Sequence, residues 1–245
     1  MTRMLRLVVA YDGTAYSGWQ IQPSRPTVQG LLVAAARPLL GEDIRLTGAS
    51  RTDAGVHALR QTVSIRTARA VPGEVVVRAL NAALPRDVRV LGCDEANVGF
   101  DARRAAIGKR YGYLLDNAPI PAPFLLRHAW HVPAALDVAS MRRGLAALRG
   151  RHDFSAFRAA AGRDHPPTCV IRALHVVRRR DRIAVLVSAD RFLHHMVRNI
   201  VGSAVEIGRG ARSHTWLADV LASRDRRRAG PTAPAHGLTL LRVLY

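Results

Sequence analysis

The chain of 245 residues carries 37 Lys and Arg against 18 Asp and Glu, which gives a formal net charge of +19 and a pI near 11.6. This length can bury one large core or two of ordinary size. The charge excess indicates a polyanionic partner, and nucleic acid fits better than a membrane because no apolar run reaches 18 residues. With no signal peptide or lipidation motif, we expect a cytoplasmic protein. Cys93 and Cys169 are too far apart for a C-x-x-C motif.

The first part of the chain predicts strands and helices in the order β-α-β-β-α-β. The predicted strands are 4–10, 44–47, 61–67 and 88–94, and the predicted helices are 28–40 and 74–84. Thr27 is a candidate N-cap for the first helix, and Pro85 closes the second. This order is the split βαβ unit of ferredoxin-like folds.

The second part predicts a similar order around a proline-rich excursion at 117–123. Its predicted elements are a strand at 105–115, a helix at 137–149, a hairpin at 170–189 with its turn at 180–182, helices at 192–207 and 216–222, and a strand at 238–244. We therefore predict an α+β fold with an N-terminal domain 1–104 and a C-terminal domain 105–245. Both would be ferredoxin-like halves, with antiparallel sheets meeting at a central basic cleft.

The loop at 48–58 is the strongest candidate for chemistry. It holds one acid, Asp53, between Gly48 and Gly55, which permit tight turns, and Arg51 lies two residues away. An arginine beside a carboxylate favours its ionised form, as a nucleophile requires. A plain surface turn has the same composition, so the loop alone leaves both interpretations open.

Ser50, Asp53 and His57 also raise the alternative of a serine hydrolase. The run from Gly48 to Thr52 nearly matches G-x-S-x-G, but the final glycine is missing and no helix is predicted after Ser50. The nucleophile-elbow pattern therefore fails in sequence and in context.

Two further segments could bind RNA. Lys109 to Tyr113 alternates on a predicted strand and partly resembles the RNP1 pattern, so Tyr111 either stacks on a base or packs in the core.

Arg198 follows His194 and His195 in the predicted helix 192–207. We expect the histidines to pack in that helix rather than bind a metal, because no H-E-x-x-H motif or acidic ligand set accompanies them. Arg198 is suited to pairing with a phosphate or a carboxylate.

Arginine runs at 178–180 and 224–228 are typical of solvated faces, and in so basic a chain we expect them to follow phosphates without reading bases.

Taken along nearly the whole chain, the sequence resembles the TruA family of tRNA pseudouridine synthases. The resemblance rests on Tyr11-Asp12-Gly13, Gly18-Trp19-Gln20, Thr27-Val28-Gln29, Ser50 to Ala58, Lys109 to Tyr113, Asp153 to Phe157, His194 to Gly202 and Ala233 to Leu238. It implies an isomerase (an intramolecular transferase) that converts uridine to pseudouridine at positions 38–40 of the tRNA anticodon stem-loop. It also implies a homodimer that needs no metal and no cofactor.

The resemblance further implies a role for each site residue. Asp53 would be the nucleophile, Arg198 its ion-pair partner, and Tyr111 the ring that stacks on the target base. Arg51 would assist extrusion of the base, and Leu238 would form an apolar wall. Attack on ribose C1′ and addition at base C6 both remain open. The alternative is a non-catalytic tRNA-binding protein or chaperone, which would need Tyr111 and the arginines but not Asp53.

Overall fold

The computed structural model describes residues 2–159 and 166–245, in which ten strands and five α-helices form two compact units. One unit consists of Met1–Ile107 with Thr239–Tyr245, and the other of Gly108–Leu238. The predicted α+β class is confirmed. The division into domains 1–104 and 105–245 stays a prediction. Within the described residues, no helix is long and apolar enough to cross a membrane.

The first unit has the element order expected from its sequence. Its elements are β1 (Arg3–Tyr11), α1 (Val28–Leu40), β2 (Arg45–Gly48), β3 (His57–Thr67), α2 (Gly73–Ala83) and β4 (Val88–Ala96). β1 lies between β4 and β3, β2 pairs with β3, and all three pairings are antiparallel. β10 (Leu238–Leu244) adds a short parallel pairing to β3, from Thr239 opposite His57 to Leu240 opposite Ala58.

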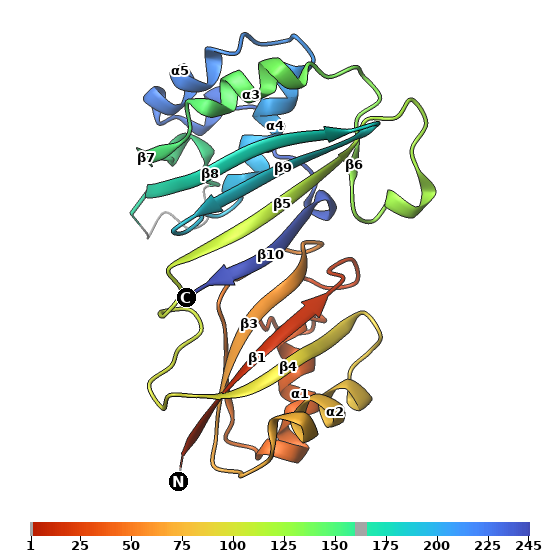
Figure 1. Ribbon diagram of the computed structural model, residues 1–245, viewed down its shortest axis with the longest axis vertical. Coiled ribbons are helices and arrows are strands. Elements are labelled where there is room, and N and C mark those ends of the chain that lie inside the picture. The colour runs from red at the N-terminus through yellow and green to blue at the C-terminus, as the bar shows by residue number, and fades with distance from the viewer. Residues whose placement is uncertain (1, 160–165) are drawn as a thin grey trace. The chain divides into compact units, whose positions relative to one another are not determined.

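Periodicity and capping explain the core of this unit. Thr27 caps α1 because its Oγ1 accepts the Gly30 N–H at 3.3 Å, and the buried side chains of α1 recur every fourth residue from Val28 to Leu40. In β1 every second residue from Leu5 is buried, as a strand with one covered face requires. Figure 1 shows α1 and α2 on the same side of β4, β1 and β3.

The second unit is built on an antiparallel sheet in the order β5-β9-β8-β7, with β6 pairing parallel to β5. Its strands are β5 (Gly108–Asp116), β6 (Trp130–His131), β7 (Gly150–Asp153), β8 (Thr168–Arg179) and β9 (Arg182–Ala189), and its helices are α3 (Val138–Ala146), α4 (Met196–Gly208) and α5 (Trp216–Ser223). The helices gather on one side of β8 and β9 (Figure 1).

The predicted helix 192–207 begins later than expected, at Met196. His195 precedes it in the left-handed conformation, with φ of 61°, and the His194 carbonyl accepts the Ala159 N–H. A residue in that conformation cannot continue a right-handed helix, so the expectation that both histidines lie in α4 was wrong.

The predicted strand 105–115 also begins later, at Gly108. Asp101 Oδ1 accepts the N–H groups of Arg103 and Arg104, and the Asp101 carbonyl accepts the Ala105 N–H. These bonds curl the chain into a turn just before β5.

Candidate active site

Thr52 anchors the loop that carries Asp53 in the first unit. Its carbonyl oxygen accepts the Trp19 N–H at 3.0 Å, and its hydroxyl lies 2.7 Å from the Tyr11 hydroxyl. All three residues are buried. The residue before Asp53 is therefore held by the end of β1 and the segment that follows it, while Asp53 itself is only half-buried.

The loop turns tightly after Asp53. Val56 N–H donates to the Asp53 carbonyl at 3.1 Å, and Gly55 has φ of +76°. The segment after β1 approaches this loop closely at Gly18, where φ is +93°. A Cβ atom on Gly18 would lie 2.7 Å from the Thr52 carbonyl oxygen. Only glycine fits at this close approach.

The start of the loop is held by a side chain of β3. Gln61 is fully buried, its Oε1 accepts the Ser50 N–H at 3.1 Å, and its Nε2 donates to the Ser50 carbonyl at 2.6 Å. The loop runs from β2 into β3, so Ser50 is not followed by the helix that a nucleophile elbow requires. The rigid frame presents Asp53 rather than Ser50.

Arg51 adds positive potential beside this carboxylate loop. Burial is the main cause of a lowered pKa of Arg51, and the nearby positive charge of Arg103 lowers this pKa further. The positive charges of Arg51 and Arg103 thus repel one another, and a bound anion would reduce that repulsion.

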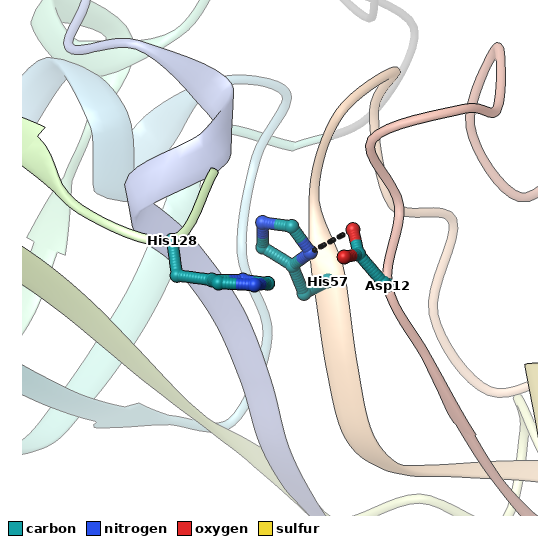
Figure 2. Close-up of side chains that lie close together, drawn as sticks. All are labelled: Asp12, His57 and His128. Atoms are coloured by element: carbon teal, nitrogen blue, oxygen red, sulfur yellow. Dashed lines mark ion pairs between the residues drawn. The ribbon is translucent and has the colours of Figure 1, made fainter. Parts of the chain in front are cut away.

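His57, which opens β3, contacts the segment after β1. Its Nδ1 accepts the Gly13 N–H at 3.0 Å and lies 3.1 Å from Asp12 Oδ1, as Figure 2 shows for the two side chains. The Asp12 contact is an ion pair when the His57 ring is protonated. His57 thus joins β3 to the segment that supports the Asp53 loop.

Tyr111 and Tyr113 lie on the buried face of β5 in the second unit. Tyr111 meets the Phe192 ring edge-on, with centroids 5.1 Å apart. Tyr113 donates its hydroxyl to the Pro234 carbonyl at 2.8 Å, and burial raises the pKa of Tyr113. The hydroxyl of Tyr113 is therefore structural.

Arg198 lies in the first turn of α4 and is oriented by the segment before β10. Its Nε donates to the Ala233 carbonyl at 2.7 Å, and its own carbonyl accepts the Ala233 N–H at 3.1 Å. Leu238, the first residue of β10, is buried and follows Gly237, which packs so closely on Tyr113 that a Cβ atom would lie 2.5 Å from that ring.

A buried polar cluster that the sequence did not reveal holds α4 to this same segment. Asn199 is fully buried, its Oδ1 accepts from Arg226 at 3.0 Å and from the Thr232 hydroxyl at 2.7 Å, and its Nδ2 donates to the Phe157 carbonyl. The Ser203 hydroxyl donates to the Asn199 carbonyl and accepts the Gly230 N–H. The only sequence signal was the position of Asn199 in the His194 to Gly202 motif.

The predicted site residues thus fall in both units. Asp53 and Arg51 lie in the first unit, and Tyr111 and Arg198 in the second, where Leu238 also belongs. The rings of His194 and His195, whose centroids are 3.9 Å apart, lie just before α4.

Comparisons with known proteins agree with these motifs. The sequence model of a family described as tRNA pseudouridine synthase matches residues 7–103 and 145–245. Proteins named tRNA pseudouridine synthase A are 45% identical in Myxococcus xanthus, over 98% of this chain and 91% of the relative, and 44% identical in Azorhizobium caulinodans, over 98% and 93%. A relative of that name in a Thermoanaerobacter strain is 38% identical over 99% of this chain and its own full length.

The relatives' similarity extends over 98% of the chain and includes the Asp53 loop, and so favours a catalytic isomerase over the non-catalytic alternative. The chain belongs to the tRNA pseudouridine synthase family.

Proposed function

We propose that the protein isomerises uridine to pseudouridine at positions 38–40 of the tRNA anticodon stem-loop. The observation that carries this proposal is the half-buried Asp53 on a loop that is anchored at Ser50 and Thr52, in a chain of the pseudouridine synthase family. The reaction breaks the N1–C1′ glycosidic bond, turns the base and forms a C5–C1′ bond, and the C5 proton leaves as a proton is taken up at N1. Substrate and product are isomers, so the chemistry needs no redox cofactor.

Asp53 is the nucleophile in this proposal. A carboxylate can attack the ribose at C1′ or add to the base at C6, and either adduct lets the base rotate before the new bond forms. The anchoring of Thr52 and Ser50 supports the role, because a nucleophile is effective when its approach geometry is set before the substrate binds.

The target base must leave its stack before Asp53 can reach it. Unstacking costs a few kcal/mol, which contacts to the flipped base and to the backbone would offset. We assign stacking to Tyr111, an apolar wall to Leu238, extrusion of the base to Arg51 and charge pairing with Asp53 to Arg198. The Ala233 carbonyl supports the last role, because it fixes the orientation of the Arg198 fork.

The same proposal includes two ferredoxin-like halves with antiparallel sheets that meet at a central basic cleft, and a cytoplasmic homodimer. The strand order β4-β1-β3-β2 and the net charge of +19 support the first of these features.

Asp53→Asn tests the chemistry because it keeps the side-chain volume and removes the nucleophilic charge. Tritium release from tRNA labelled at uridine C5 should fall below detection, while tRNA affinity should remain close to that of the wild type because the arginines are unchanged.

Ser50→Ala is the matched control and should release tritium at close to the wild-type rate. Release at the wild-type rate by Asp53→Asn would refute the mechanism. A wild-type protein that binds tRNA and releases no tritium from any tRNA would instead support the non-catalytic alternative.

A further inference from the structure

A hollow of about 440 Å³ lies in the second unit at the turn of the β8–β9 hairpin, apart from the proposed catalytic residues. It is lined by the turn Arg179 to Arg182 and by Asp116, Ala118 and Ala122. Asp116 is the last residue of β5 and pairs with Arg182. The hollow is therefore formed where β5 and the hairpin end together.

Hydrogen bonds fix both walls of this hollow. Asp116, which is buried, accepts the Ala122 N–H at Oδ2, 2.8 Å away, and the Ala118 N–H at Oδ1, 3.3 Å away. The Asn117 N–H donates to the Asp181 carbonyl at 2.6 Å. The Asp116 carboxylate is thus engaged with backbone and shapes the wall, and the hairpin turn is tied to the same segment.

Three arginines of the turn are not used by the fold. The side chains of Arg179, Arg180 and Arg182 are exposed, and none makes a hydrogen bond or ion pair with any residue in 2–159 or 166–245. By contrast, the neighbouring Arg178 donates to the Leu136 and Arg180 carbonyls. The three arginines outnumber the two carboxylates of the lining, Asp116 and Asp181, so the hollow is net positive and favours an anion. A guanidinium fork suits a phosphate.

We propose that this hollow binds phosphates of the RNA backbone in a stem beyond the target nucleotide, an inference that rests on the proposed function for its tRNA substrate. Asp116 is five residues along β5 from Tyr111, which corresponds to about 17 Å at the rise of an extended strand. That span covers on the order of five phosphates along one strand of a duplex. The contact positions the tRNA and carries no sequence information.

The test compares two triple variants that remove the same charge. The hollow variant carries Arg179→Gln, Arg180→Asn and Arg182→Gln, which remove every guanidinium group that lines the hollow. Asparagine at position 180 tolerates the left-handed φ of 54° there. The control variant carries Arg143→Gln, Arg209→Gln and Arg212→Gln. These three arginines lie on the helical side of the unit, where they contact Asp137, Glu206 and Trp216, respectively. Circular dichroism and thermal unfolding check that both variants fold.

The hollow variant should bind full-length tRNA about tenfold more weakly near 0.1 M salt, and its log-log salt slope should be shallower by about 2, as expected for three lost phosphate contacts. The control should change both quantities much less. Equal losses in the two variants would overturn the proposal, because they would show only a general charge effect.

Inorganic phosphate provides the second arm. Titration calorimetry that detects phosphate binding by the wild type but not by the hollow variant, together with unchanged tRNA affinity of that variant, would assign the hollow to a small phosphate compound and overturn the RNA contact. The proposed function fails separately: if the wild type makes no pseudouridine while the hollow variant still loses tRNA affinity, the isomerase is refuted and the hollow stands.

Discussion

Thr52 illustrates how a single residue can fix the backbone beside the proposed nucleophile, Asp53. Its carbonyl and hydroxyl contact Trp19 and Tyr11, which precede it by more than thirty positions, and neither contact involves the carboxylate of Asp53. The Asp53 loop could be predicted from its own composition. The anchors could not, because local sequence does not show which distant strand a hydroxyl will meet.

Tyr11→Phe should release one side of the Asp53 loop. It removes the buried hydroxyl contact to Thr52 and leaves the Thr52 hydroxyl with one partner fewer, at a cost of about 1 kcal/mol. We expect kcat for tritium release to fall several-fold with little change in KM, since tRNA contacts remain. Steady-state kinetics measures both parameters.

Tyr16→Phe is the matched control for this substitution. It removes the hydroxyl bond from Tyr16 to Asp87 in the same unit but leaves Thr52 untouched. An equal fall in kcat for the two variants would show that any lost hydroxyl in this unit slows the reaction, and would contradict a positioning role for Tyr11.

The two thiols predict a loss of stability at alkaline pH. Burial raises the pKa of Cys93 and of Cys169 from 9.0 to about 11. Between these values the unfolded chain releases the thiol protons while the folded chain keeps them, so the free energy of unfolding falls as pH rises above 9. For Cys169, which is fully buried, the loss reaches about 2 kcal/mol at pH 11. Urea unfolding between pH 8 and 11 measures it.

Cys169→Ala separates this titration from ordinary packing. The variant is less stable at neutral pH because it loses a buried group, but its free energy of unfolding should fall less steeply above pH 9 than that of the wild type. Parallel pH profiles of the two proteins would contradict the assignment to Cys169.

At the scale of elements, agreement between local signals decides what could be predicted. α1 has its expected bounds because the Thr27 cap and the helical spacing of its apolar residues point to the same start. β10 likewise has its expected bounds. The start of α4 was missed since nothing local marks His195 as left-handed, and the two-residue β6 is too short to show alternation.

Asn199 joins three elements of the second unit, namely α4, the turn at Phe157 and the segment that includes Arg226 and Thr232. Asn199→Ala leaves these groups buried without their partner, so we expect a loss of about 2–4 kcal/mol in the free energy of unfolding. Urea unfolding measures the loss. Ser213→Ala, at an exposed site with a local hydroxyl contact, should change it by less than about 0.5 kcal/mol.

The Asn199 cluster also links stability to the site, because Arg198 and Ala233 are its direct neighbours in sequence and in space. Thr232→Val removes only one hydroxyl of the cluster. If Thr232→Val were to destabilise the protein as strongly as Asn199→Ala, Asn199 would not be the centre of the network.

For the molecule as a whole, the net charge of +19 overstates the number of positive charges that are available to bind RNA. Several arginines serve the fold by donating to backbone carbonyls: Arg142 to Val176, Arg149 to Leu174, Arg191 to Thr168 and Arg226 to Gly230. Others form ion pairs, as Arg3 does with Glu95. Composition therefore predicts a polyanionic partner, but only the structure separates binding arginines from structural ones.

This separation predicts the salt dependence of tRNA binding. Each neutralised phosphate contributes about −0.7 to −0.9 to the slope of log K against log salt concentration, so affinity should fall steeply between 50 and 200 mM salt. Because many arginines are engaged in the fold, the slope should be well short of the value near −13 that nineteen neutralised phosphates would give. Filter binding of tRNA at four or five salt concentrations measures it. Asp53→Asn, which alters no arginine, should give the same slope as the wild type. Affinity that is flat over this range would contradict electrostatic binding, and a slope of −13 or steeper would contradict the structural assignment of the arginines.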